Sequence, residues 1–280
     1  ESIFESSAMV QSGLLATDAR LNNITGVTVE LPFFRPLNYN EEVLDSSATW
    51  GDQGKGVLTW QKQTASSQYG VFTNRTAGFS MDDLSVVETG EDALANIRSQ
   101  LATDMNRKQT AKVISQLTGL LSGALADHEL VIATQADDYS GYDDSNYMNA
   151  GAVTQAKSLL GERGGELGVI VMHSAVHYHL QALGLLTFMN SGGTVNYASN
   201  GIGVTSTDVG YFCGLRVVVD DQCPKTTTSK KTPIYTSYLA APGVIRTGSQ
   251  YPITIKTAES IDTWTQQMAV KYSQIHHVLG

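Results

Sequence analysis

The amino-acid sequence predicts an α+β fold whose strands gather in the C-terminal half. Three observations point to it. An amphipathic pattern at 89–122 predicts a helix far longer than the usual length of about 11–12 residues. Apolar and alternating segments between 167 and 278 predict a series of strands. The Gly-, Asp- and Tyr-rich segment 137–149 between them is typical of a loop. Mixed strands that follow a long helix in this way indicate an α+β protein.

The composition favours a protein that associates with copies of itself. Of the 280 residues, 41% are hydrophobic and only 16% are charged, against roughly 25% in an average protein. Polar uncharged residues and 26 glycines take the place of the missing charge. A surface with little charge does little to keep copies apart. The formal net charge of −9 argues against a large basic face for nucleic acid.

Several other classes are excluded. No apolar segment approaches the roughly 20 residues that span a bilayer, and the N-terminus lacks the basic start and apolar core of a secretory signal. The two cysteines, Cys213 and Cys223, match no common zinc-binding spacing. We expect reduced thiols in a reducing cytoplasm.

The N-terminal part predicts a strand followed by an extended hairpin. Val27, Val29 and Leu31 alternate with polar residues, and two prolines at 32 and 36 keep the next segment extended. From 38 to 80, a Gly-rich turn at 51–56 separates two strand-like segments that are too polar to bury their own face. We therefore expect this hairpin to contact other subunits through its aromatic residues, Tyr39, Trp50, Trp60, Tyr69 and Phe72.

The long helix is predicted from its cap and its apolar stripe. Thr89 and Asp92 form a start that resembles a capping box. Leu101 belongs to the stripe that should face the core, whereas Gln109 is expected on the solvent side. The stripe consists of Leu94, Ile97, Leu101, Met105, Ile114, Leu117 and Leu121.

The C-terminal half predicts two shorter helices and a run of strands. One helix should span 152–163 and end at two glycines, and another should begin at Ser174 and end near Gly184. A buried strand is expected between them at 167–172. The later strands are expected at 215–219, 234–239, 244–246, 253–257 and once or twice within 263–278.

No catalytic or metal-binding constellation emerges from the sequence. His173 and His177 share a helix face, but His179 projects elsewhere and no glutamate takes the position of a zincin base. Ser174 is better explained as a helix cap than as a nucleophile. The aspartates near 137–144 lack the order of a calcium loop, and the glycines at 201 and 203 lack the third glycine of a dinucleotide loop. We expect no cofactor and no metal.

Five segments in order along the chain resemble the major capsid proteins of tailed double-stranded DNA bacteriophages. Each segment alone is weak, but the ordered set covers nearly the whole chain. The segments are QSGLL at 11–15, VTVELPF at 27–33, VMHSAV at 171–176, GLRVVVDD at 214–221 with Pro224, and YTSYL at 235–239 with the small turn at 243–245.

The resemblance implies the Hong Kong 97-type capsid fold. Residues 1–37 would form the N-terminal arm and 38–80 the extended loop. Residues 81–148 and 254–280 would form the peripheral domain, with the helix at 89–122 as its spine. Residues 149–253 would form the axial domain at the centre of a capsomer.

The resemblance also implies a structural protein and not an enzyme. Hexamers and pentamers of the chain would build the icosahedral shell of a virion, assembled in the host bacterial cytoplasm, and would enclose double-stranded DNA without reading its sequence. Scaffolding, portal and decoration proteins are the further partners that it implies, and no membrane is expected. Alternatives are the shell of a cellular nanocompartment with the same fold, a zinc-dependent hydrolase that uses the three histidines, and a secreted adhesion module.

Overall fold

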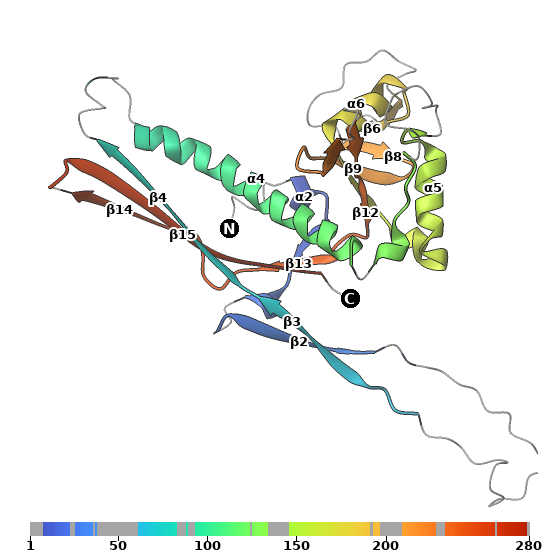
Figure 1. Cartoon of the computed structure of the whole chain (residues 1–280), viewed down its shortest axis with the longest axis horizontal. Coiled ribbons are helices and arrows are strands. Elements are labelled where there is room, and N and C mark those ends of the chain that lie inside the picture. The colour runs from blue at the N-terminus through green and yellow to red at the C-terminus, as the bar shows by residue number, and fades with distance from the viewer. Residues whose placement is uncertain are drawn as a thin grey trace, which may run out of the picture.

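The structure is a computed structural model of the chain (Figure 1). Its described residues are 8–22, 26–35, 37, 61–82, 88, 93–123, 125–133, 146–190, 193–196, 209–227, 233–260 and 262–278. Within these ranges, helices and strands are mixed, as the predicted α+β class requires. None of the described helices is long and apolar enough to cross a membrane.

Helix α4, Ala93–Leu121, is the longest element and confirms the predicted long helix. At 1.5 Å per residue, its 29 residues give a length of roughly 44 Å. It lies along one face of the strands β4 and β15 (Figure 1). Leu101 is buried as predicted. Thr89 and Asp92, the predicted cap, lie outside the described residues.

The solvent position predicted for Gln109 is wrong, because this side chain is only 2% exposed. Gln109 follows Met105 by four residues and precedes Val113 by four. Residues spaced by four share a helix face, so Gln109 lies in the stripe that faces the sheet. The polarity of a glutamine was a poorer guide to its position than its spacing.

The first sheet, which we call the long sheet, is organised around strand β15, Thr265–Val278. β15 pairs antiparallel with three strands, and β1 then joins β13 in parallel. The predicted strands at 244–246 and 253–257 are therefore β13 and β14, and the C-terminal segment is one strand rather than two. The partners are β4 (Thr73–Asp82), β13 (Ile245–Gly248), β14 (Thr254–Ser260) and β1 (Leu15–Thr17).

The burial of β15 changes along its length. In its first half, buried residues such as Met268 and Val270 alternate with exposed ones, since only one face is covered by α4. From Tyr272 to His276 every residue is buried. Even-numbered side chains there face α4, while Ile275 on the opposite face packs against a second pair of strands.

That second pair is an antiparallel ribbon of β2, Thr28–Phe34, and β3, Ala65–Val71. The β2 strand agrees with the predicted alternation. The strand-like segment at 69–73, predicted within a hairpin at 38–80, is divided between β3 and β4, and β3 pairs with β2, which precedes the predicted hairpin. Gly70 lets the ribbon approach β15: a Cβ atom there would lie 2.6 Å from Cδ1 of Ile275.

The second sheet, which we call the compact sheet, has six strands in the order β12-β5-β9-β8-β6-β7. β5 and β9 are parallel, and the other neighbours are antiparallel. The predicted strand at 234–239 is divided into β11 and β12. The strands are β5 (Val169–Met172), β6 (Thr187–Asn190), β7 (Gly193–Asn196), β8 (Val209–Phe212), β9 (Leu215–Val219) and β12 (Tyr238–Ala240), and β10 (Lys225–Thr227) pairs with β11 (Pro233–Tyr235) beside them.

Helices cover the compact sheet. On one face, Ile170 and Met172 pack with Val153 of α5 and Leu180 of α6. The α-helix predicted at 152–163 is shorter, because 161–166 form a 3₁₀ helix, η4. The helices are α5, Ala150–Ser158, and α6, Ser174–Ala182.

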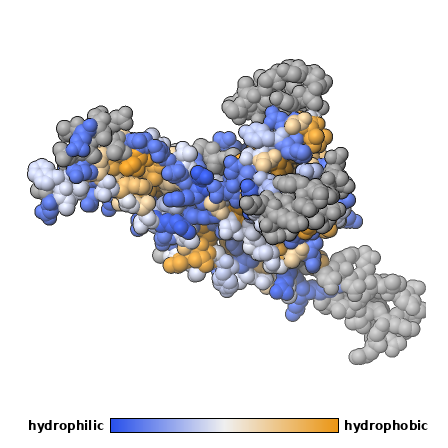
Figure 2. Space-filling view, turned by 45° about the horizontal axis from the view of Figure 1, so that its top comes forward, coloured by the Kyte–Doolittle hydropathy of each residue, from blue (hydrophilic) through white to orange (hydrophobic). Residues whose placement is uncertain are grey.

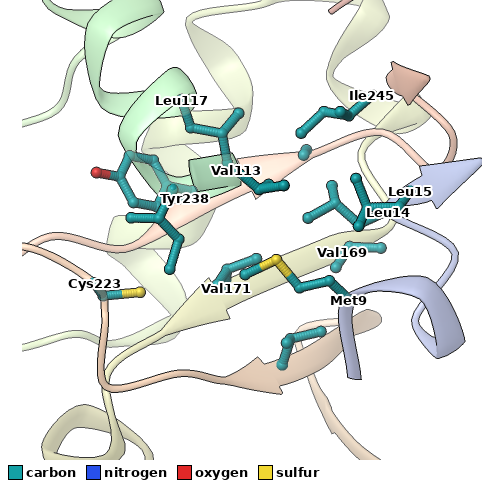
Figure 3. Packing of buried hydrophobic residues seen from close by; sticks show 13 residues of the cluster. Met9, Leu14, Leu15, Val113, Leu117, Val169, Val171, Cys223, Tyr238 and Ile245 are labelled. Atoms are coloured by element: carbon teal, nitrogen blue, oxygen red, sulfur yellow. The ribbon is translucent and has the colours of Figure 1, made fainter. Parts of the chain in front are cut away.

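The opposite face of the compact sheet joins the rest of the molecule. Val169 and Val171 of β5 pack with the C-terminal half of α4 and with the N-terminal segment (Figure 3). That segment contains α2, Ala8–Gln11, and two short 3₁₀ helices complete the described elements, η1 (Ala19–Leu21) and η2 (Ala126–His128). Ile245 of β13 belongs to the same core, so β13 links the two sheets. Its pairing with β15 places β13 in the long sheet, although the predicted boundary at 253 assigned it to the axial domain.

Candidate subunit-contact surface

The β2–β3 ribbon presents an exposed face that carries apolar side chains. Strand alternation places Glu30 and Phe34 of β2 on that face, opposite Tyr69 and Ala65 of β3. Tyr69 is 67% exposed, and its hydroxyl donates a hydrogen bond to Oε1 of Glu30 over 3.3 Å. The large exposed hydrophobic residues of this region are Val27, Phe34, Leu37, Tyr69 and Val71. We call these five residues the ribbon surface.

The five contact residues predicted from the sequence therefore have different outcomes. Tyr69 lies on the ribbon surface, where a partner can reach it. The prediction for Phe72 is wrong for this chain, since Phe72 is 3% exposed and packs with Leu21 and Ile275 in the chain's own core. Tyr39, Trp50 and Trp60 lie outside the described residues.

Trp264 is a second exposed aromatic residue at an end of the molecule. It lies between β14 and β15, where the chain reverses, and is 71% exposed. Its φ of 47° is in the left-handed region, which non-glycine residues adopt uncommonly. The sequence analysis did not include Trp264 among the contact residues; its position next to the turn at 260–263 is the signal that could have suggested it. Figure 2 shows that hydrophobic residues form separate patches on the face in view, with hydrophilic areas between them.

The three histidines at the start of α6 and within it have different neighbours. The His173 ring lies 4.6 Å from that of Tyr235, and the His179 ring lies 5.1 Å from that of Tyr147. His177 contacts Tyr178, and partial burial lowers its pKa. Among the described residues, no three His, Cys, Asp or Glu side chains are grouped as metal ligands would be. The aspartates at 137–144 and the glycines at 201–203 lie outside the described residues.

Ser174, His173 and Asp221 come together, but not as a catalytic triad. A triad needs the serine on one ring nitrogen and the carboxylate on the other. Here Nδ1 of His173 is 3.4 Å from Oγ of Ser174 and 3.7 Å from Oδ1 of Asp221, and it also accepts the N–H of Ala175. Asp221 accepts the N–H of Ser174, and hydrogen bonding by Ser174 lowers its pKa. The group thus caps α6, with His173 as the N-cap residue rather than Ser174.

The two cysteines differ in environment. Cys213 is exposed, in a turn with φ of 50°. Cys223 is buried in the core between the sheets, and burial, with Asp220 and Asp221 nearby, raises the pKa of its thiol to about 12. A thiol with that pKa stays protonated and unreactive at neutral pH.

A polar seam lies between the two apolar contacts that hold α4 to the sheet. We define it as Gln109 and Lys112 of α4 together with Gln274 and His276 of β15. Gln109 and Gln274 line a pocket of about 190 Å³, and their Oε1 atoms have no hydrogen-bond partner among the described residues. Nζ of Lys112 and both ring nitrogens of His276 also have no hydrogen-bond partner among the described residues. Burial lowers the pKa of Lys112 to about 8 and that of His276 to about 4.

Comparison with known proteins shows what this chain is similar to in sequence and in fold. The major capsid protein of Bacillus phage SPP1 is 28% identical over 245 residues, which cover 85% of this chain and 67% of that protein. Among solved structures, the capsid of Ralstonia phage GP4 aligns with a TM-score of 0.65 at 10% identity, over 95% of this chain and 82% of the other. A chain from Mycobacterium phage Adephagia aligns with a TM-score of 0.62 at 13% identity, over 97% and 83%. The chain is related to phage major capsid proteins and has their fold.

The family resemblance and the Hong Kong 97-type fold class predicted from the sequence are thus confirmed. No family model matches the chain. The similarity to the solved capsid structures is a similarity of fold, because their sequence identity lies between 10% and 13%.

Proposed function

We propose that this chain is the structural subunit of a phage capsid shell, in which hexamers and pentamers of it build an icosahedral head around double-stranded DNA. The observation that carries the proposal is the agreement between a capsid fold over nearly the whole chain and the relationship to a phage major capsid protein. The assembled protein would be located in the virion, after assembly in the host cytoplasm. Scaffolding, portal and decoration proteins are the further partners that this function calls for.

The proposed domain roles follow from the arrangement of the two sheets. The long sheet with α4 would form the peripheral domain, and the compact sheet would form the axial domain at the capsomer centre. The β2–β3 ribbon leads into the segment 38–60, and together they would make the extended loop that contacts a neighbouring subunit. An exposed apolar face on a narrow two-stranded ribbon supports this, because such a face is otherwise left in water.

The proposal includes no enzymatic activity. The group most similar to a catalytic site, Ser174 with His173 and Asp221, serves as a helix cap, and its serine and carboxylate approach the same ring nitrogen. Replacing His173, His177 and His179 together by alanine should therefore leave assembly intact apart from lost packing. Loss of stoichiometric zinc and of assembly in that variant would favour the hydrolase alternative instead.

Electron microscopy of the purified protein tests the function directly. Closed shells that contain nucleic acid would support a phage capsid, and closed shells that contain protein cargo would support a nanocompartment. A protein that stays monomeric at every concentration would refute both. Nuclease treatment before imaging should leave the enclosed nucleic acid intact, because the shell protects it.

The ribbon surface can be tested in the same assay. Replacing Tyr69 and Phe34 by alanine should leave the monomer folded but reduce shell formation, since both side chains are exposed in the single chain. Tyr178→Ala is the matched control, because Tyr178 on α6 is also 67% exposed. Equal loss of assembly in both variants would contradict a special role for the ribbon.

A further inference from the structure

Three basic side chains gather where α4 crosses the long sheet. Lys108 and Lys112 are one turn apart on α4. Arg75 of β4 is the cross-strand partner of Tyr272 on β15, and Nζ of Lys112 lies 5.1 Å from the centre of the Tyr272 ring. Arg75 and Lys108 are exposed, while Lys112 is half-buried. We call Arg75, Lys108 and Lys112 the basic cluster.

The basic cluster has no counterion within the described part of the chain. The ion pairs found there are Asp18–Arg20, Arg163–Glu166 and the weak contact of His173 with Asp221. Nζ of Lys112 is shielded from water and touches no acceptor oxygen there. Burial, together with the charges of Arg75 and Lys108, lowers the pKa of Lys112 to about 8.

This arrangement is costly in an isolated chain. Cations that lie side by side repel one another, and a half-buried ammonium without an acceptor loses hydration without compensation. The chain has 27 acidic and 18 basic residues, so a carboxylate near these three cations would be the ordinary arrangement. The positions of Arg75, Lys108 and Lys112 therefore suit an anionic partner that the described part of the chain does not supply.

His276 adds a further group without a partner. It is nine-tenths buried on the same face of β15 as Tyr272, and neither ring nitrogen has a hydrogen-bond partner among the described residues. Burial lowers the pKa of His276, and the positive charge of Lys112 contributes to the same effect. A neutral imidazole offers one N–H donor. Lys112 thus contributes positive charge here, whereas the chain itself covers the ring nitrogens of His276.

We infer that the basic cluster binds a carboxylate group supplied by a second copy of this chain. The inference rests on the proposed function, because it is in a shell that a second copy covers each subunit. The exposed Arg75 and Lys108 can hydrogen-bond a carboxylate, and the buried ammonium of Lys112 adds positive charge nearby. The excess of acidic residues ensures that the surface of a neighbouring copy is rich in carboxylates.

Nucleic acid fits the same cluster less well. Proteins bind a phosphate backbone with a row of exposed cations along it. Here only Arg75 and Lys108 are exposed, and the ammonium group of Lys112 is shielded from water. A molecule with net charge −9 also repels a polyanion at long range. A second copy is repelled less strongly than a polyanion, because its charge of −9 is spread over 280 residues of both signs.

Reversing the exposed charges tests the inference. In the double variant Arg75→Glu and Lys108→Glu, the concentration needed for half-maximal shell formation, measured by light scattering, should rise at least about tenfold. The monomer should keep its circular dichroism spectrum, because both side chains are exposed. Lys256→Glu on β14 is the matched control, since Lys256 is exposed and lies outside the cluster. Assembly of the double variant at the native concentration would overturn the inference.

Replacing Lys112 by Met separates binding from folding. Methionine is unbranched and one atom shorter than lysine, so the change keeps most of the apolar stem but removes a charge that is costly in the free subunit. The unfolding midpoint of the monomer should therefore stay the same or rise, while the concentration needed for assembly rises about tenfold. A lower unfolding midpoint together with normal assembly would show that Lys112 has only an internal structural role, and would overturn the inference.

Two further arms distinguish other anions. The first arm adds inorganic phosphate at about 10-fold excess over the native monomer. If phosphate binds and the double variant still assembles normally, the cluster is a site for free anions. If the double variant assembles normally but encloses less DNA, the phosphate backbone is the ligand. Either result overturns the assignment to a second copy. A native protein that forms no shells refutes the proposed function, and this inference with it.

Discussion

The compact sheet and the long sheet bury their strands in different ways. In the compact sheet, all four residues of β5 are buried, because α5 and α6 cover one face and α4 with the N-terminal segment covers the other. In the long sheet, six of the seven residues of β14 are exposed, and α4 covers only one face of β15 over its first half. Both faces of β5 in the compact sheet are thus covered within the chain, whereas the first half of β15 in the long sheet is covered by α4 on one face only.

The apolar clusters along the length of α4 show the same difference within one helix. Val113, Ile114 and Leu117 contribute to the large core shared with the compact sheet. Leu101 and Met105 belong to a small cluster with Val270 and Tyr272. Between these two clusters lies the polar seam, where α4 and β15 meet with little apolar contact. The C-terminal half of α4 is therefore packed in a larger apolar core than the part of α4 that covers the long sheet.

The largest effect is expected from Leu101→Pro, which breaks α4 within the long sheet. Proline removes a helix hydrogen bond and clashes with the preceding turn, at a cost of about 3 kcal/mol or more. Hydrogen exchange should then quicken in β4, β14 and the first half of β15 and change little in β5 and β9. Thr103→Ala on the exposed face should have almost no effect. Equal loss of protection in β5 would mean that the two sheets unfold as one unit.

Acidification should weaken the polar seam by a comparable amount. The folded pKa of His276 is about 4 against an ordinary 6.5, so the unfolded chain takes up a proton at a higher pH than the folded chain does. The contribution of neutral His276 to the free energy of unfolding is therefore fully present above about pH 6.5. It is lost as the pH falls toward 4, by about 3 kcal/mol in total. Denaturant unfolding between pH 7 and pH 4 measures it.

A matched pair of variants assigns this pH dependence to the seam. His276→Gln should remove most of it, because glutamine does not titrate. His128→Gln, on the short helix η2, should keep it, since His128 is exposed. Persistence of the whole dependence in His276→Gln would show that other groups, and not the polar seam, are responsible.

A smaller effect is expected where the ribbon packs against the long sheet. In Gly70→Val, the new side chain would collide with Ile275 and Val29, and overpacking of this kind costs about 1–3 kcal/mol. The ribbon should separate from β15, which tryptic cleavage at Lys62 or Arg75 would report. Gly78→Val, on β4, is the control, because a Cβ atom there meets nothing within 4 Å. Equal cleavage of the two variants would contradict the contact.

Sequence patterns were most informative where the partners of an element are nearby in the chain. The strand predicted at 215–219 coincides with β9, and the long helix was located within four residues at its start. The pairing of β2 with β3 was missed because the two strands are more than 30 residues apart and neither is strongly apolar. Such a pairing is decided by contacts with Ile275 at the far end of the chain, which no local pattern contains.

The contact residues show the same limit. Tyr69 and Phe72 are both aromatic and three residues apart, yet one is exposed and the other is buried. The face on which each lies depends on the β2–β3 register and on where β3 ends, and a shift of one residue in a strand exchanges the two faces. The basic cluster was missed for a similar reason, because Arg75 and Lys112 are brought together only by the packing of α4 on the sheet.

The smallest effect should distinguish the two sheets by burial alone. Ile170→Val removes one methylene group from a fully buried side chain in the compact sheet, which costs about 0.5–1.5 kcal/mol. Ile255→Val makes the same change on β14, where the side chain is 46% exposed, and should change stability by less than about 0.5 kcal/mol. Both residues are β-branched, so strand preference is nearly constant and the difference reports the cover over each sheet. Denaturant unfolding of the monomer measures both values. Equal losses of stability would mean that β14 is covered as well as β5 is in the monomer, and would contradict the difference between the two sheets.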